Sequence, residues 1–101
     1  MTKRKITDEK DFLFECVLAL ETVEECYDFF EDLCTTREVE EMSRRMKAAR
    51  MLSDNKVYAE VVNETKLSTA TISRVNRCLK DGADGYARVL ERAKKKAEAD
   101  K

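Results

Sequence analysis

The sequence predicts an all-α protein, and three observations support that prediction. The 101 residues include no proline and only two glycines, so the chain lacks the residues on which tight β-turns and hairpins depend. Charged residues make up 41% of the chain, against roughly 25% in an ordinary domain. Apolar residues recur every three or four positions through most of the sequence, as they do along one face of a helix. We therefore expect a single small domain of about six helices over residues 1–101.

The first two helices are expected within residues 8–34. Thr22 and Glu25 form a capping-box pattern at the start of the second helix. The apolar stripes are Phe12, Leu13, Cys16, Val17 and Leu20 in the first helix and Val23, Cys26, Tyr27, Phe30, Leu33 and Cys34 in the second. Phe14 and Phe29 lie outside these stripes, which indicates that the two helices are covered on more than one side. A second copy of the chain would supply that cover, and scattered exposed apolar residues are the alternative.

The longest helix is predicted over residues 36–53, where Thr35 and Glu38 repeat the capping-box pattern. Its apolar side carries Val39, Met42, Met46, Ala49 and Leu52. Its other face is basic and carries Arg44, Arg45, Lys47 and Arg50. The polar run Ser-Asp-Asn at residues 53–55 offers N-cap candidates for a short helix at about residues 56–64.

Residues 56–80 have the pattern of a helix-turn-helix. The short first helix leads into a tight turn at residues 65–67, and Ser68 can cap the second helix. Leu67 can fill the corner between the two helices. The short first helix carries the apolar residues Tyr58, Val61 and Val62, and the second helix is expected to bury Ile72, Val75 and Leu79. Lys66 occupies a turn position at which glycine is common, so either a left-handed backbone there costs about 1 kcal/mol or the turn has another shape.

The second helix of this pair can place its N-terminus in the major groove of DNA. Short polar side chains allow close approach to the bases, and arginine supplies a forked donor that matches guanine. The candidates for facing bases are Ser68, Thr69, Ala70, Ser73, Arg74 and Arg77. The candidates for phosphate contacts are Arg44, Lys47, Arg50, Lys56, Lys66 and Lys80.

A last helix is expected at residues 85–97, after a C-cap formed by Asp81 and Gly82. Its apolar side carries Tyr86, Val89, Leu90 and Ala93. The sequence then ends in RAKKKAEADK, which is either a solvated charged terminus or a flexible tail that seeks phosphate.

The net charge of −1 hides a strong asymmetry between the two halves of the chain. Residues 1–43 hold 5 basic and 13 acidic side chains, whereas residues 44–101 hold 15 basic and 8 acidic ones. The net charges of the halves are therefore −8 and +7. Such polarity predicts that the second half faces a polyanion, and two ordinary charged helical surfaces are the alternative.

The composition excludes several classes of active site. Without histidine, the chain cannot use Ser-His-Asp or Cys-His catalysis, and it cannot form HExxH or Cys2His2 zinc sites. Its cysteines form no CxxC pair for a metal or a redox centre, so we expect reduced packing residues at Cys16, Cys26, Cys34 and Cys78. The start, MTKRKITDEKDF, has no apolar run long enough for a signal peptide or a membrane span. We expect a cytoplasmic protein that is not an enzyme and binds neither metal nor membrane.

Two segments of the chain resemble known proteins. TATISRVNR, at residues 69–77, resembles the recognition helix of many bacterial helix-turn-helix repressors. Residues 35–80 resemble the Trp repressor superfamily, especially its Trp-repressor-related branch of small regulators. This resemblance implies a Trp repressor-like fold, in which the N-terminal helices of two chains interlock into an intertwined homodimer and a helix-turn-helix projects from each side.

The resemblance also implies where a small-molecule effector would lie. In the amino-acid-responsive members, the corepressor lies between the long central helix and the recognition helix. Matching positions for such a pocket in this chain are Thr35, Arg45, Thr71, Arg74 and Val75. Val75 stands where the tryptophan-binding members have glycine, and Cys78 stands where they have serine. Because the branched Val75 would fill the slot for an indole, we expect no cofactor and no tryptophan corepressor, and another effector stays open.

Together these features predict a homodimeric transcriptional regulator that binds a specific sequence of double-stranded DNA. Repression is the expected mode of regulation. The alternative is a helical adaptor that keeps the fold, has lost specific DNA readout and binds a protein through its acidic or basic face. The small side chains that accompany Arg74 favour DNA, because a protein-binding helix more often exposes aromatic residues.

Overall fold

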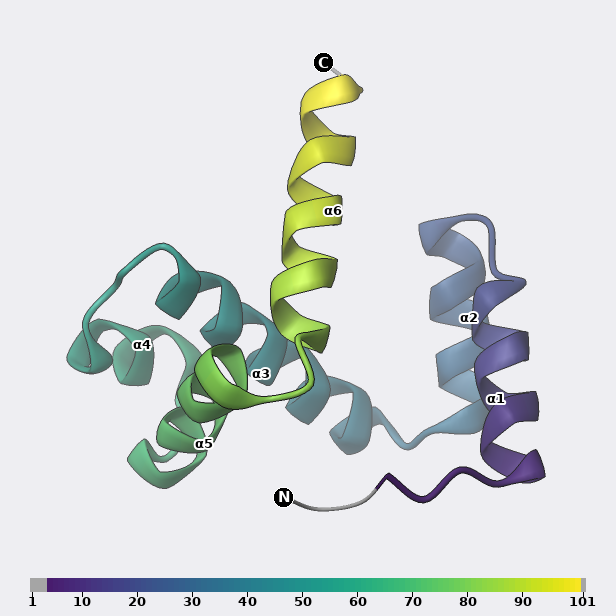
Figure 1. The fold of residues 1–101 in the computed structure, drawn as a ribbon, viewed down its shortest axis with the longest axis horizontal. Helices are drawn as coiled ribbons and strands as arrows, with labels where there is room; N and C mark the ends of the chain where they lie inside the picture. Colours follow the sequence, from purple (N-terminus) through teal and green to yellow (C-terminus); the bar gives the residue numbers. More distant parts are fainter. Residues whose placement is uncertain (1–3, 101) are drawn as a thin grey trace. The chain divides into compact units, whose positions relative to one another are not determined.

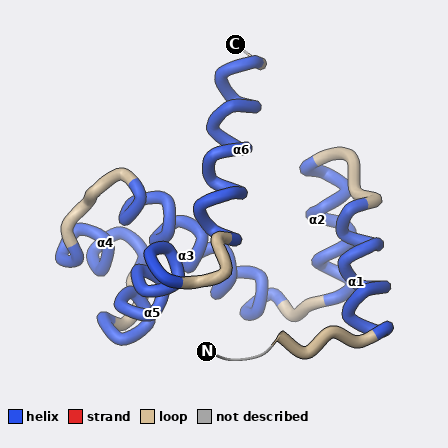
Figure 2. The backbone as a smooth tube through the Cα atoms, viewed as in Figure 1, coloured by secondary structure: helices blue, strands red, loops and turns tan. Residues whose placement is uncertain are grey.

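The computed structural model describes residues 4–100, and this range contains six α-helices and no β-strand (Figures 1 and 2). The helices are α1 (Asp8–Leu18), α2 (Val23–Leu33), α3 (Thr36–Ser53), α4 (Tyr58–Thr65), α5 (Thr69–Asp81) and α6 (Gly85–Ala99). The all-α prediction is confirmed. The chain divides into two compact units, an N-terminal unit that ends at Thr36 and a C-terminal unit that begins at Arg37. The expectation of a single domain stays a prediction.

Threonine side chains cap both helices of the N-terminal unit. The Thr7 hydroxyl accepts a hydrogen bond from the Lys10 amide at 3.1 Å, and the Thr22 hydroxyl accepts one from the Glu25 amide at 3.0 Å. The capping box expected at Thr22 differs in one respect. The Glu25 carboxylate accepts a hydrogen bond at 3.0 Å from the amide of Glu21, one residue before the cap.

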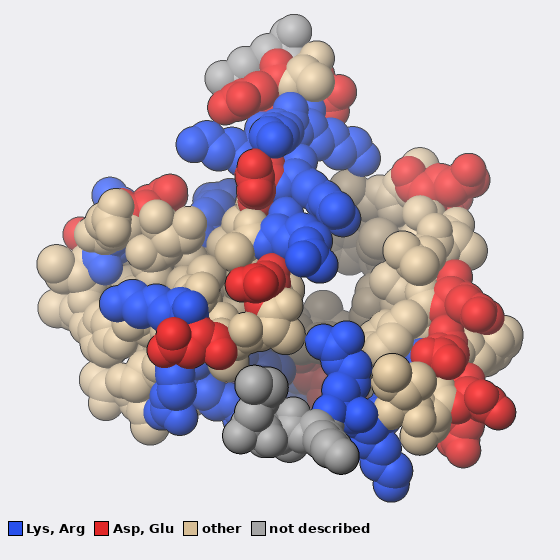
Figure 3. Space-filling view, viewed as in Figure 1, with Lys and Arg blue, Asp and Glu red and all other residues tan. Residues whose placement is uncertain are grey.

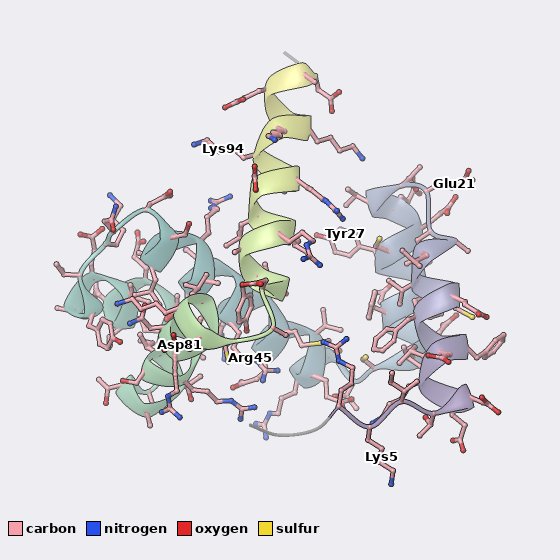
Figure 4. The ribbon with its side chains drawn as sticks, viewed as in Figure 1. Lys5, Glu21, Tyr27, Arg45, Asp81 and Lys94 are labelled. Atoms are coloured by element: carbon pink, nitrogen blue, oxygen red, sulfur yellow. The ribbon has the colours of Figure 1, made fainter. Side chains whose placement is uncertain are left out.

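No residue of α1 or α2 is buried within the chain. The large apolar side chains that are exposed on these helices are Phe12, Phe14, Leu18, Val23, Tyr27 and Leu33. Phe12 is 68% exposed and Leu18 is 84% exposed, and Figure 4 shows Tyr27 projecting from α2. Phe29 and Phe30 meet edge to face, with 5.3 Å between their ring centroids. The apolar surface of this unit therefore lacks the cover that the sequence indicated.

Residues 53–55 close α3, so the prediction that they cap the next helix is wrong. Asn55 has a left-handed backbone with φ of 65°, and its amide donates to the Leu52 carbonyl at 3.0 Å. The Lys56 amide donates to the Met51 carbonyl at 3.0 Å, which completes a Schellman motif. The N-cap of α4 is instead Val57, whose side chain makes no capping hydrogen bond. As a result, α4 begins later than residue 56.

The core of the C-terminal unit lies where α3, α4 and α5 meet. Its buried residues are Ala48, Met51, Val61, Leu67 and Ile72, and the partly buried Leu52 and Val62 pack against them. The apolar stripe predicted for α3 is therefore wrong in part. Met46 is 37% exposed, whereas Ala48 and Met51, which lie outside that stripe, are buried. Burial follows the part of α3 that the short helices α4 and α5 cover, and hydrophobic spacing alone does not locate that part.

Gly82 permits the tight connection between the packed helices α5 and α6. Its amide donates to the Cys78 carbonyl at 3.0 Å, so the predicted C-cap is confirmed. A Cβ atom at Gly82 would lie 2.9 Å from the Cα of Cys78 and closer still to its carbonyl oxygen. No helix within residues 4–100 combines the length and the apolar character needed to cross a membrane.

Candidate nucleic-acid interface

A buried threonine and a buried leucine hold the turn between α4 and α5. The Thr65 hydroxyl donates to the Val61 carbonyl at 2.7 Å and accepts a hydrogen bond from the Leu67 amide at 3.3 Å. Thr65 is 3% exposed and Leu67 is 6% exposed, which confirms that Leu67 fills the corner. The sequence reasoning missed the role of Thr65. The available signal was a threonine four residues after one core residue and two residues before another.

Lys66 has a left-handed backbone. The sequence allowed either this conformation or a turn of another shape. Its φ and ψ are 61° and 19°, and its amide donates to the Val62 carbonyl at 2.9 Å, which ends α4. Its side chain is exposed. The turn therefore has the shape for which glycine is usually selected, with a lysine in place of glycine.

Ser68 is the N-cap of α5, as predicted. Its hydroxyl oxygen accepts a hydrogen bond from the Thr71 amide at 3.1 Å, and its hydroxyl group donates to the Thr71 hydroxyl at 3.0 Å. Ser68 is exposed and Thr71 is half-buried. Because both functions of the Ser68 hydroxyl are engaged in the cap, this side chain positions the start of α5.

The remaining base-facing candidates fall largely on one side of α5. Successive residues of a helix are rotated by about 100°, which puts Ala70, Arg74 and Arg77 roughly opposite the buried Ile72 and puts Ser73 at the edge of that face. Ser73 is half-buried, and the other three are exposed, as is Thr69 near the cap. Neither arginine has an ion-pair partner among the described residues. Two unpaired guanidinium groups thus flank small side chains on an open helix face.

The six candidates for phosphate contacts are all exposed. Arg44, Lys47 and Arg50 lie on α3, and Lys80 lies near the end of α5. Lys56 pairs with Glu60 at 3.7 Å, and each side chain is about half exposed. An exposed pair of this kind contributes little energy, so it does little to keep Lys56 from another anion.

The charge asymmetry follows the boundary between the two units. Residues 1–36 hold 4 basic and 10 acidic side chains, and residues 37–101 hold 16 basic and 11 acidic ones. The net charges of the units are therefore −6 and +5. On the face shown in Figure 3, acidic side chains gather over α1, and Lys and Arg gather over α6. The charge that suits a polyanion belongs to the unit that holds the helix-turn-helix.

The positions matched to an effector pocket are divided between the two units of the chain. Thr35 belongs to the N-terminal unit, and the other four belong to the C-terminal unit. Arg45, labelled in Figure 4, is half-buried on α3, and Arg74 is exposed on α5. Val75 is 2% exposed, so its side chain already occupies the space beneath α5.

A groove of about 1020 Å³ lies elsewhere in the C-terminal unit, where the ends of α3 and α5 face α6. Leu52, Leu79 and Leu90 supply apolar lining, and Arg50 and Lys80 also line the groove. None of the five effector-pocket candidates lines it. Within residues 4–100, no group of three or more histidine, cysteine or acidic side chains is arranged to hold a metal.

These features define a helix-turn-helix protein, because a buried turn joins two packed helices and the second presents an open cationic face. A family model described as Trp repressor protein matches residues 8–94. The chain belongs to the Trp repressor family. Membership places it among helix-turn-helix regulators that bind DNA.

Three relatives support this assignment. YerC, an uncharacterized protein of Bacillus subtilis strain 168, is 49% identical over 86 residues, which are 85% of this chain and 83% of YerC. A crystal structure of a candidate Trp repressor from Staphylococcus aureus has a TM-score of 0.84 and 44% identity, covering 88% of this chain and 89% of that one. A TrpR-like protein from Eubacterium eligens has a TM-score of 0.83 and 47% identity, covering 86% and 90%. The resemblance inferred from the sequence is confirmed.

Proposed function

We propose that this chain is a transcriptional regulator that binds a specific sequence of double-stranded DNA as a homodimer and acts as a repressor. The observation that carries the proposal is the outward face of α5. There, Ala70 lies beside Arg74 and Arg77 on the side opposite the core, and the half-buried Ser73 lies at the edge of this face. A helix with a small-residue surface can approach base edges closely, and the arginines add the donors that distinguish bases.

Arg74 and Arg77 are the proposed base readers. They lie three residues apart and so project from neighbouring positions on one helix face. Each guanidinium can donate two hydrogen bonds to O6 and N7 of a guanine. Ala70 and Thr69 offer methyl groups that suit the methyl group of thymine. Ser68 keeps its capping bonds and contributes by fixing the start of the helix.

The phosphate contacts are assigned to the exposed cations that surround this face. The proposed set is Arg44, Lys47, Arg50, Lys56, Lys66 and Lys80. Such contacts release condensed counterions, so they add affinity for any sequence and make binding weaker as salt rises. They also hold the protein in register on the duplex.

The homodimer is proposed because a single chain leaves much apolar surface open. No residue of α1, α2 or α6 is buried, and Phe12, Leu18 and Val89 are each more than half exposed. The groove along α6 is open as well. Obligate dimers bury surface of this composition, which resembles half of a domain core. The opposite net charges of the two units favour the association of two copies.

The proposed regulator uses neither a cofactor nor tryptophan and carries out no enzymatic reaction. The buried Val75 fills the position at which an indole would need space. We place the protein in the cytoplasm, with the DNA that it regulates.

Selection from random duplexes tests the proposal. The purified protein is incubated with random-sequence duplexes at about 150 mM salt, where nonspecific attraction to phosphate is already weakened. We expect enrichment of a motif with two-fold symmetry, because a dimer presents two copies of α5. Arg74→Ala is selected in parallel and is expected to blur or lose one base position of that motif. Lys95→Gln, on α6 outside the proposed interface, is the matched control for loss of one positive charge.

The outcomes separate the two functional classes. An enriched symmetric motif that the Lys95→Gln protein retains supports a sequence-reading dimer. Failure of the parent protein to enrich any motif contradicts sequence-specific binding under these conditions and favours the adaptor interpretation. A protein partner that binds the acidic or basic face is then sought by pulldown with the full chain as the bait.

A further inference from the structure

Each connection between helices of the C-terminal unit contains one residue with a left-handed backbone. These residues are Asn55, Lys66 and Asp84, with φ of 65°, 61° and 65°. Asparagine and aspartate tolerate this conformation because their short polar side chains can bond to the nearby backbone. Lysine has no such compensation. The exceptional residue therefore lies in the turn between α4 and α5, where the proposed function places DNA.

The packing on both sides of Lys66 enforces its conformation. Thr65 is buried and bonded to the Val61 carbonyl and the Leu67 amide, and Leu67 is buried in the core. Lys66 cannot leave the left-handed region without disturbing these contacts. Glycine would adopt the same backbone without a clash between Cβ and the carbonyl oxygen. Folding alone thus gives no reason for lysine at this position.

The side chain of Lys66 is available to a ligand. It is exposed and has no ion-pair partner among residues 4–100. By contrast, Lys56 pairs with Glu60 and Lys95 pairs with Glu91, in each case one helical turn away. Lys66 stands two residues before the N-cap of α5, so the backbone of the turn fixes the Cα of Lys66 close to the start of that helix.

We propose that Lys66 is a positioning residue that contacts a DNA phosphate at the edge of the major groove and thereby sets the register of α5. The inference rests on the proposed function and adds that a strained residue is retained for binding at a cost in stability. A phosphate contact carries no sequence information, but it fixes the orientation of the helix that reads bases. A charge held on a rigid turn loses less conformational freedom on binding than one on a flexible tail.

The test compares four variants by thermal unfolding and by DNA titration over a range of salt concentrations. Lys66→Gly removes both the strain and the charge, whereas Lys66→Arg keeps both. Asn55→Gly changes an uncharged left-handed residue, and Lys95→Gln removes a charge from a helix without changing a turn. The DNA is the best duplex from the selection and a duplex mismatched to it.

Lys66→Gly is expected to unfold a few degrees above the parent protein, because glycine relieves the left-handed strain. Its affinity for both duplexes is expected to fall by about three- to tenfold at about 150 mM salt. The slope of log affinity against log salt becomes shallower by about one per chain. Lys66→Arg keeps the parent slope. Asn55→Gly and Lys95→Gln bind DNA as the parent does.

Three results would overturn the inference. The first is that Lys66→Gly binds with the affinity and salt slope of the parent. The second is that Lys66→Arg binds as weakly as Lys66→Gly, and the third is that Lys66→Gly unfolds at a lower temperature than the parent. Parent-like binding by Lys66→Gly together with weakened binding by Arg74→Ala leaves the proposed function intact and removes only the role of Lys66. If the parent protein does not distinguish the best duplex from the mismatched one, the proposed function falls and this inference falls with it.

Discussion

Replacing Thr65 with valine measures how much one buried hydroxyl stabilises the turn between α4 and α5. Valine keeps the branched shape and nearly the volume of threonine but lacks the hydroxyl. In the structure, that hydroxyl donates to the Val61 carbonyl at 2.7 Å and accepts from the Leu67 amide at 3.3 Å. Thr65→Val therefore removes two hydrogen bonds and leaves the Leu67 amide without its side-chain acceptor.

The expected loss is about 2 kcal/mol of unfolding free energy. A hydrogen bond of the kind made to Val61 contributes about 0.5–1.5 kcal/mol, and a buried donor left unsatisfied costs about 1–3 kcal/mol. The bond to Leu67 is long, so the lower end of the second range applies. Since a domain of this length is stable by only about 5–15 kcal/mol, the loss is a large fraction of the total.

Urea denaturation at one fixed protein concentration gives the difference in free energy, because the midpoint of a dimer depends on concentration. Thr65→Ser is the matched control. It keeps the hydroxyl and removes one methyl group, at a cost of about 1 kcal/mol. We expect Thr65→Val to be the less stable of the two. If Thr65→Val matched the parent protein, the hydroxyl would not hold this turn, and the argument from its two hydrogen bonds would be refuted.

Three further predictions concern the DNA contact, the last turn and the dimer. Arg74→Ala lowers the affinity for the best duplex by about 1–3 kcal/mol and relaxes the preference at one base position, whereas Lys80→Ala weakens binding to all duplexes alike. Fluorescence anisotropy on duplexes with single base changes checks both predictions. If Arg74→Ala binds the best duplex as tightly as the parent protein does, Arg74 does not read a base. Gly82→Ala lowers the unfolding temperature, because its Cβ would collide with the Cys78 carbonyl; an unchanged melting curve would show that the turn relaxes freely. Phe12→Ser is expected to raise the dimer dissociation constant at least about tenfold, because burial of the exposed phenylalanine contributes about 1.5–3 kcal/mol. Sedimentation equilibrium measures this constant. A dimer as tight as that of the parent protein would place Phe12 outside the interface.

The caps and the helix positions were predictable because they depend on residues close together in the chain. The Thr22 and Ser68 hydroxyls each accept a hydrogen bond from an amide three residues later, which a sequence pattern detects directly. The same reasoning failed at residues 53–55. Polar residues between two helices can cap the end of the first helix or the start of the second. Here the left-handed backbone of Asn55 ends the first helix, α3.

The candidate site was predictable to the level of a helix face. Helical spacing separates Arg74 and Arg77 from the buried Ile72, and the structure leaves both arginines exposed. Spacing did not identify the hydroxyl of Thr65 as the group that holds the turn. That role depends on the burial of Leu67, which only the packed structure shows.

The sequence by itself determined the all-α class, the helix-turn-helix and the charge asymmetry, because each follows from composition or from spacing within a few residues. Only the tertiary structure decided which part of α3 is buried, with Ala48 inside and Met46 outside. It also decided that Lys66 takes the left-handed backbone, since Thr65 and Leu67 are held on either side. Burial and backbone strain depend on how segments distant in the sequence pack against each other, and a local sequence pattern contains no information on that packing.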